Sequence, residues 1–230
     1  MLKKTTHTQL IILIDPDKYN SSLVDLANTC HVSYIFVGGS SLKKNNFAKT
    51  IHSIKSKTTI PVIIFPGDET QFSKKADGLL ILSLLSGRNS DYLIGKHVKV
   101  AQKIKTSGII TIPVGYILVG DKHKSATQKI TKTKALSSSK DILNTAIAGE
   151  LLGKKIIYLE AGSGAKKVVL PSLIKKVKQQ LLVPLIVGGG IDSVEKAKQL
   201  ISSNPDYIVI GNALEKNPEF LLELNSLFTV

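Results

Sequence analysis

The stretch LIVGGGIDSVEKAKQLI, residues 185–201, contains the pattern of a strand, a tight turn and a helix in immediate succession. Its first residues are continuously apolar, which is typical of a strand buried on both faces of a parallel sheet. Three glycines follow, and Asp192 or Ser193 is well placed to cap a helix whose apolar residues recur at helical spacing. The stretch therefore predicts one strand–helix unit of an α/β fold.

The same pattern recurs along the whole chain of 230 residues. Eight short apolar runs lie at 10–14, 34–37, 62–65, 78–82, 109–113, 156–159, 185–187 and 207–210. Helix-like segments lie at 21–30, 41–57, 90–106, 140–152, 166–182, 193–202 and 215–227. The segment 66–77 is too short and polar for a full helix, so the third connection is expected to be irregular. This alternation predicts an α/β protein, a single (β/α)8 barrel of the TIM type over residues 1–230.

An open, doubly wound sheet is the alternative fold. It would need fewer strands, or a glycine-rich dinucleotide turn after the first strand. The first strand is followed instead by Asp15-Pro16-Asp17-Lys18. No linker and no second core are evident, which favours the barrel.

Composition excludes several classes of protein. Lys+Arg number 31 and Asp+Glu 17, so the formal net charge is 31 − 17 = +14, and Arg88 is the only arginine. With 43% hydrophobic residues the chain is not expected to be disordered. The single cysteine, the absence of a signal-peptide pattern and the lack of a run of ~20 apolar residues predict a soluble, cytoplasmic protein.

The positive charge is concentrated in one part of the chain. Residues 96–140 contain ten lysines and one acid, which is 10 − 1 = +9 of the total. Nucleic acid is not the expected partner, because arginine is the preferred group for phosphate and guanine contacts and aromatic residues are scarce. Two interpretations stay open for the segment 120–140: a solvated loop, or a rim that attracts a polyanionic substrate.

Function in such a barrel belongs to the loops that follow the strands. Asp15 follows the first strand and Ser40 follows the second, in Gly38-Gly39-Ser40. Oxygen ligands of this kind suit Mg²⁺, which usually takes one or two carboxylates together with substrate phosphates. Both residues are also suited to cap a following helix.

The last three strands carry the more specific signals. Glu160 ends the sixth strand, and a carboxylate at a barrel mouth is costly to desolvate without a partner or a task. The Gly162-Ser163-Gly164 loop that follows offers N–H groups and a hydroxyl to an anion. Loops after the seventh and eighth strands form the phosphate site common in these barrels, here Gly188-Gly189-Gly190 and Gly211-Asn212. The pattern predicts a phosphorylated small molecule as ligand.

Taken together, these strand ends resemble one known family, the geranylgeranylglyceryl phosphate synthases, which include the bacterial heptaprenylglyceryl phosphate synthases. The resemblance covers residues 15–213 and rests on the following motifs: Leu13-Ile14-Asp15-Pro16-Asp17-Lys18, Val37-Gly38-Gly39-Ser40, Tyr158-Leu159-Glu160-Ala161-Gly162-Ser163-Gly164-Ala165, Val187-Gly188-Gly189-Gly190-Ile191 and Ile210-Gly211-Asn212-Ala213.

The resemblance implies a Mg²⁺-dependent prenyltransferase of ether-lipid biosynthesis. The enzyme would join a polyprenyl diphosphate to the 3-hydroxyl of sn-glycerol 1-phosphate and release diphosphate. It implies Asp15 and Ser40 as metal ligands and Glu160 as the acceptor of the hydroxyl proton. The implied substrate-binding residues are Tyr158, Leu159, Glu160, Ala161, Gly162, Ser163, Gly164, Gly189, Gly190, Gly211 and Asn212.

Two departures and several expectations accompany the resemblance. Leu13 stands where some members carry lysine, which favours a geranylgeranyl over a heptaprenyl donor. The loop after the fifth strand usually carries Ser-Asn-Thr, and the nearest equivalent here is Thr131-Lys132-Thr133. We also expect an apolar groove for the prenyl chain, a homo-oligomer and weak peripheral association with membranes. The alternatives are a phosphosugar isomerase on the same barrel, or a non-catalytic basic module.

Overall fold

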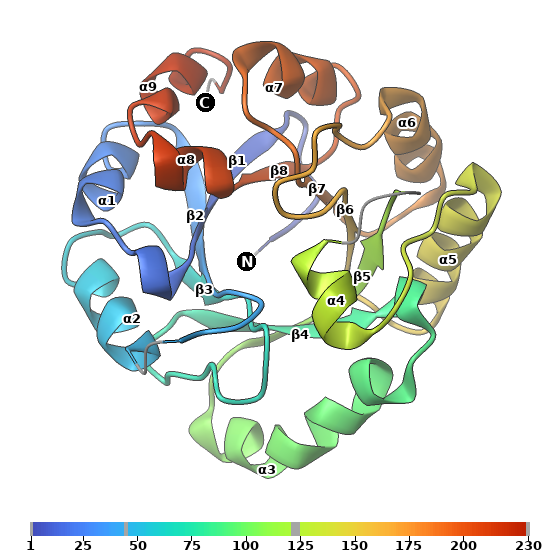
Figure 1. Cartoon of the computed structure of the whole chain (residues 1–230), viewed down its shortest axis with the longest axis horizontal. Coiled ribbons are helices and arrows are strands. Elements are labelled where there is room, and N and C mark those ends of the chain that lie inside the picture. The colour runs from blue at the N-terminus through green and yellow to red at the C-terminus, as the bar shows by residue number, and fades with distance from the viewer. Residues whose placement is uncertain (1, 44–45, 121–124, 229–230) are drawn as a thin grey trace.

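A computed structural model describes residues 2–43, 46–120 and 125–228 of the chain. Eight parallel strands close into a barrel in which each strand pairs with its neighbours in sequence, and β8 pairs with β1 (Figure 1). The strands are β1 (Gln9–Ile14), β2 (Val32–Val37), β3 (Val62–Ile64), β4 (Gly78–Leu84), β5 (Thr111–Leu118), β6 (Ile156–Glu160), β7 (Leu185–Gly188) and β8 (Tyr207–Ile210). The predicted (β/α)8 barrel is confirmed.

Helices surround this barrel (Figure 1). They are α1 (Ser21–Ala27), α2 (Phe47–Lys55), α3 (Lys96–Ser107), α4 (Ala126–Thr131), α5 (Ser139–Leu151), α6 (Pro171–Gln180), α7 (Val194–Ile201), α8 (Asn212–Lys216) and α9 (Phe220–Asn225), with shorter helical turns η1 (Pro16–Lys18), η2 (Leu85–Gly87) and η3 (Asp91–Gly95). Ser193 caps α7, because its side chain accepts from the Lys196 N–H at 3.3 Å. Of the two predicted caps, Asp192 and Ser193, the second is therefore correct. The connection between β3 and β4 has no helix, as predicted.

The core has two layers because successive side chains of a strand point to opposite faces. Along β6, Tyr158 lies inside the barrel while Leu159 packs between the barrel and the helices. Burying one such side chain contributes about 1.5–3 kcal/mol. Leu2 enters the interior layer, and its N–H donates to the Tyr34 hydroxyl at 3.1 Å. The N-terminal segment therefore packs into the barrel interior, whereas the predicted site residues lie at the C-terminal ends of the strands, called here the mouth.

The fifth strand was predicted too early, at 109–113. In the structure it begins at Thr111 and continues to Leu118. Pro113 resembles a strand end in sequence, but its carbonyl accepts from the Lys155 N–H at 2.8 Å and it stays in the sheet. Gly115 also stays in the sheet, paired with Ser83 on β4 and Ile157 on β6, and a Cβ there would lie 2.8 Å from a Leu85 methyl. Tight packing, which composition does not reveal, requires glycine at this position.

The last predicted helix, 215–227, is also wrong in its bounds. The segment forms two short helices, α8 and α9, separated at Asn217. Asn217 is extended, with φ −141° and ψ 93°, and it precedes Pro218. A residue before proline is disfavoured in the helical region, so the helix stops there.

The polar segment after β5 contains a helix that its weak periodicity did not predict. In α4, the Ser125 side chain accepts from the Gln128 N–H at 3.2 Å, and the Gln128 side chain accepts from the Ser125 N–H at 3.0 Å. This reciprocal pair is a capping box, which stabilises a helix start. The sequence Ser-x-x-Gln was thus a usable signal. The part of the predicted lysine-rich rim at 121–124 lies outside the described residues.

Within the residues that the structure describes, no helix is long and apolar enough to cross a membrane.

Candidate active site

Glu160 lies at the mouth end of β6 with its side chain on the barrel interior. Only 7% of its surface is exposed. Its Oε1 accepts from the Gly162 N–H at 2.8 Å, and the Tyr158 hydroxyl is a second partner. Burial raises the pKa of Glu160 from its ordinary value to about 7, partly offset by these two hydrogen bonds. Near neutral pH the carboxylate can therefore accept a proton and release it again.

Glycines on β7 make room for this buried carboxylate. A Cβ at Gly188 would clash with the Tyr158 hydroxyl, and a Cβ at Gly189 would clash with Glu160 Oε1 and lie 2.7 Å from the Gly162 nitrogen. The glycine turn after β7 was predicted only as a phosphate site. The structure shows that it is also required for the position of Glu160.

The predicted phosphate loops come together beside Glu160. Gly189 and Gly190 both have positive φ, +87° and +75°, a region that favours glycine. Within the described part of the chain, their N–H groups donate to no protein acceptor. Ser163 Oγ donates to Asn212 Oδ1 at 3.1 Å, which joins the loop after β6 to the loop after β8. Converging free N–H groups of this kind bind anions.

Asp15 and Ser40 lie at the neighbouring strand ends, β1 and β2. Asp15 Oδ1 accepts from the Asp17 N–H at 2.9 Å, and Oδ2 lies 3.9 Å from Lys18 Nζ. A Cβ on Gly39 would approach Asp15 Oδ1 to 3.2 Å, so the carboxylate lies directly against the loop that carries Ser40. Among the described residues, no three His, Cys, Asp or Glu side chains cluster as a metal site. One carboxylate and one hydroxyl fit a magnesium ion that takes its remaining ligands from substrate and water.

Gln71 is a residue of the mouth that the sequence did not single out. It lies in the irregular connection after β3, is 2% exposed, and holds the backbone of the loop after β2. Its Oε1 accepts from the N–H groups of Gly39 at 3.2 Å and Gly67 at 3.1 Å, and its Nε2 donates to the Gly39 carbonyl at 2.7 Å. The side chain therefore fixes the loop that places Ser40. No periodicity or motif in 66–77 pointed to it.

Gln71→Leu is expected to lower turnover at least about tenfold and to destabilise the fold by about 1–3 kcal/mol, because it leaves partly buried backbone groups of Gly39 and Gly67 unpaired. Gln71→Glu keeps the acceptor but loses the donor to the Gly39 carbonyl, so an intermediate loss is expected. Steady-state kinetics and urea unfolding of the two variants measure both effects. Equal turnover in the native protein and the leucine variant would contradict the positioning role.

A pocket of about 140 Å³ opens beside this loop and extends toward α3. Gly39 and Ser40 line its mouth end, and mostly apolar side chains line the rest, including Phe65, Val100 and Ile104. Two features of the fold leave this space open. No helix covers the connection between β3 and β4, and α3 has no buried residue, so it does not pack closely on the strands. A mostly apolar pocket is therefore present beside the strands, whereas a groove along the barrel for a prenyl chain stays a prediction.

The connection after β3 is tied to α3 by an ion pair. Lys96 Nζ lies 2.6 Å from Glu69 Oε2, and Lys99 Nζ lies 3.7 Å from Glu69 Oε1. Both Glu69 and Lys96 line the pocket. On the barrel side, Tyr116 packs edge-on against Tyr158 with ring centroids 5.1 Å apart. The pocket thus reaches the aromatic layer that adjoins Glu160.

Some predicted residues lie apart from this arrangement. Leu159 is fully buried between the barrel and the helices, so its side chain does not face the mouth. Ala161 is half-buried and packs against the same layer. In the loop after β5, Thr131 lines the pocket, and its hydroxyl lies 2.7 Å from that of Thr133. The remaining predicted loops, at Gly162–Gly164, Gly189–Gly190 and Gly211–Asn212, meet at the mouth.

The fold and the site together define a (β/α)8 barrel with a candidate phosphate site and an apolar pocket next to a buried carboxylate. The chain belongs to the PcrB family, whose model matches residues 3–226. The geranylgeranylglyceryl phosphate synthase of Chitinophaga pinensis is 42% identical over 219 residues, which is 93% of this chain and 87% of that protein. The enzyme of the same name from Pyrococcus horikoshii is 38% identical over 219 residues, covering 93% and 85%.

Solved structures agree with this assignment. The (S)-3-O-geranylgeranylglyceryl phosphate synthase of Thermoplasma acidophilum, in complex with sn-glycerol-1-phosphate, superposes with a TM-score of 0.89 at 32% identity and covers 96% of this chain and 93% of its own. A tryptophan synthase α-subunit from Pyrococcus furiosus gives a TM-score of 0.60 at 13% identity, over 98% of this chain and 97% of its own, which shows the fold alone. The family expected from the sequence is confirmed, and with it the class of enzyme, a prenyltransferase.

Proposed function

We propose that the chain transfers a prenyl group from a polyprenyl diphosphate to the 3-hydroxyl of sn-glycerol 1-phosphate. The observation that carries the proposal is the position of Glu160 between two different subsites. On one side lie the free N–H groups of Gly189 and Gly190, suited to a phosphate. On the other side, past Tyr158 and Tyr116, lies the apolar pocket, suited to a hydrocarbon chain.

The chemistry of the transfer matches these groups. The hydroxyl oxygen forms a bond to the allylic carbon while the carbon–oxygen bond to diphosphate breaks, and the hydroxyl proton passes to the Glu160 carboxylate. A carboxylate within hydrogen-bond reach of the nucleophile typically contributes ~10²–10⁴-fold. Gly162 and Tyr158 hold the acceptor oxygens in place through their hydrogen bonds.

Asp15 and Ser40 would hold a magnesium ion at the strand ends next to the pocket. When bound, the ion supplies a Lewis acid that stabilises the negative charge growing on diphosphate. The chain contributes one carboxylate and one hydroxyl there, which leaves coordination positions for the substrate. This donor set supports the proposed magnesium dependence.

Asp15→Asn is expected to lower turnover about 100-fold or more and to raise the magnesium concentration needed for half-maximal rate, because it removes the carboxylate proposed as metal ligand. Asp25→Asn is the matched control: Asp25 lies on α1 and pairs with Lys57 at 3.2 Å, away from the mouth. Magnesium titrations of the two variants test this prediction. Unchanged magnesium dependence in Asp15→Asn would refute the metal assignment.

The length of the prenyl chain that the enzyme accepts depends on the room in the apolar pocket. We propose geranylgeranyl diphosphate as the preferred donor, with heptaprenyl diphosphate as the alternative in the same reaction. The relatives named above carry the geranylgeranyl name, and Leu13 favours that subgroup. Homo-oligomer formation stays a prediction.

The direct test is a transfer assay with magnesium, both enantiomers of glycerol phosphate, and prenyl diphosphates of several lengths. Mass spectrometry of the lipid fraction should show an ether-linked prenylglyceryl phosphate, formed fastest from sn-glycerol 1-phosphate and geranylgeranyl diphosphate. If no combination yields such a product, the proposed function is wrong. Metal-independent conversion of a phosphosugar by the same preparation would instead favour the isomerase alternative.

A further inference from the structure

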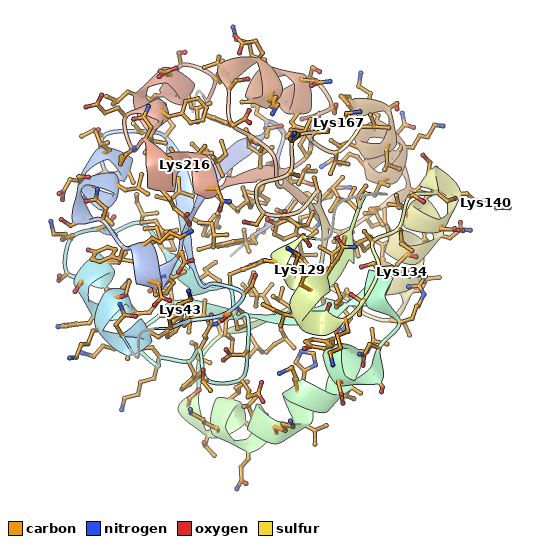
Figure 2. All side chains as sticks on the ribbon, in the orientation of Figure 1. Lys43, Lys129, Lys134, Lys140, Lys167 and Lys216 are labelled. Atoms are coloured by element: carbon orange, nitrogen blue, oxygen red, sulfur yellow. The ribbon has the colours of Figure 1, made fainter. Side chains whose placement is uncertain are left out.

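Six lysines surround the mouth of the barrel (Figure 2). They are Lys43, Lys129, Lys134, Lys140, Lys167 and Lys216, and all six are exposed. They come from the connections that follow β2, β5, β6 and β8. Because all connections that follow strands of a parallel barrel emerge at the same end, these side chains share one face of the molecule.

The six lysines have no counter-charge among the described residues, and the same holds for Lys132 and Lys166 in the connections after β5 and β6. None of them forms an ion pair with any residue that the structure describes. Other mouth lysines are neutralised: Lys18 lies 2.7 Å from Glu215, Lys96 lies 2.6 Å from Glu69, and Lys196 lies 2.7 Å from Asp192. Unpaired lysines, the six among them, therefore give this face its positive charge.

Apolar side chains are exposed on the same face. Ile94 precedes α3 and is 61% exposed, Ile130 on α4 is 42% exposed, and Leu170 before α6 is 62% exposed. Exposed apolar residues are ordinary when single, but these accompany a ring of unpaired lysines. Lysine with exposed aliphatic side chains is the composition of surfaces that lie on anionic membranes.

The spread of the lysines discriminates between two kinds of anion. A small phosphorylated substrate bound at Gly189 and Gly190 can contact only lysines near that loop. The six come instead from connections on opposite sides of the barrel, after β2 and after β5 to β6 (Figure 2). A flat anionic surface is the partner that can face all of them at once. Nucleic acid fits less well, because the chain has a single arginine, Arg88, and it is engaged by Thr145 at 2.8 Å.

We propose that the mouth face docks on an anionic phospholipid bilayer. The proposal rests on the proposed function in one respect: the prenyl donor and the product are lipids, and the pocket that would hold them reaches the mouth at Gly39 and Ser40. Docking lets the hydrocarbon chain pass from the bilayer into the pocket without crossing water. The lysines supply attraction to the headgroups, and the exposed aliphatic side chains reach the boundary of the acyl region.

The test is the partition of the purified full chain onto vesicles, measured by flotation without substrate. Vesicles of phosphatidylcholine with about 30% phosphatidylglycerol are compared with pure phosphatidylcholine, at low and high salt. The mouth variant carries Lys129→Gln, Lys134→Gln, Lys140→Gln and Lys167→Gln. The matched control carries the same change in charge at four exposed lysines away from the mouth, Lys105→Gln, Lys155→Gln, Lys176→Gln and Lys198→Gln.

Each lysine that reaches an anionic surface contributes roughly fivefold to partition. We expect the native chain to prefer anionic vesicles, to lose that preference at high salt, and to bind at least about tenfold less in the mouth variant but less than about twofold less in the control. Equal partition of the native chain onto both kinds of vesicle would overturn the proposal, and so would equal losses of binding in the two variants. A third contrary result is a native chain that binds no vesicles, together with a raised KM for glycerol phosphate in the mouth variant. The last result would assign the lysines to the attraction of soluble substrates. Because partition is measured without turnover, failure of the proposed reaction would leave this test unaffected.

Discussion

Glu160→Gln is expected to lower turnover about 100- to 10,000-fold and to make the folded protein more stable at pH 8. The loss of turnover follows because glutamine cannot accept the hydroxyl proton. Glutamine keeps an oxygen that accepts from Gly162, so binding of glycerol phosphate should change little. The gain in stability follows because the native chain buries a negative charge at this position.

The raised pKa of Glu160 determines how the free energy of unfolding depends on pH. The pKa of Glu160 is raised from 4.5 to about 7 in the folded chain, so the folded state holds its proton more tightly than the unfolded state. The stability that this provides is full below about pH 4.5 and is lost as the pH rises through about 7. Removing the charge should therefore raise the free energy of unfolding by about 1–3 kcal/mol at pH 8 and by much less at pH 5.

Turnover of the native chain should show the opposite trend, because the acceptor must be ionised. The rate is expected to fall as the pH drops below about 7. Kinetics and urea unfolding across this range, with Glu219→Gln as an exposed control, measure both effects. A glutamine variant with native turnover, or one less stable than the native chain at pH 8, would contradict the assignment.

Gly189→Ala is expected to abolish detectable binding of glycerol phosphate and to destabilise the fold by about 2–5 kcal/mol. Two effects add at this position. The φ of +87° disfavours any side chain, and the new Cβ would clash with Glu160 Oε1 and the Gly162 backbone. The clash displaces the proton acceptor together with the anion site.

Gly153→Ala separates these two effects. Gly153 has a similar φ of +82°, but a Cβ there would meet nothing within 4 Å. This control should cost only about 1–2 kcal/mol and leave binding intact. Calorimetric titration with glycerol phosphate and thermal unfolding of both variants provide the measurements. If the two variants bind glycerol phosphate equally well and are equally stable, the predicted clash of the Gly189 Cβ with Glu160 does not matter.

The order of the barrel strands was predictable because most strands are continuously apolar. That property follows from burial on both faces and is local in sequence. The bounds of β5 were not predictable, because Pro113 and Gly115 resemble breaks in sequence and only their pairing with the neighbouring strands keeps them in the sheet. The division into α8 and α9 was readable in principle from Pro218.

The residues of the site that directly follow a strand were predictable from the sequence. The predicted positions of Glu160, Asp15 and the glycine turns all lie at the mouth, because parallel strands of a barrel end together. Gln71 was not predictable, since it acts through contacts with Gly39 and Gly67 that depend on the path of an irregular connection. Leu159 belongs to the motif at the end of β6, but its side chain points away from the barrel interior and is buried against the helices. Membership of a motif therefore does not show which way a side chain points.

A crystal structure of the chain with sn-glycerol 1-phosphate would show directly whether Glu160 faces the nucleophile. The phosphate is expected on the N–H groups of Gly189, Gly190 and Asn212. The 3-hydroxyl is expected within hydrogen-bond distance, about 2.6–3.2 Å, of Glu160 and facing the pocket. A phosphate bound elsewhere, or a 3-hydroxyl directed away from Glu160, would contradict this expectation.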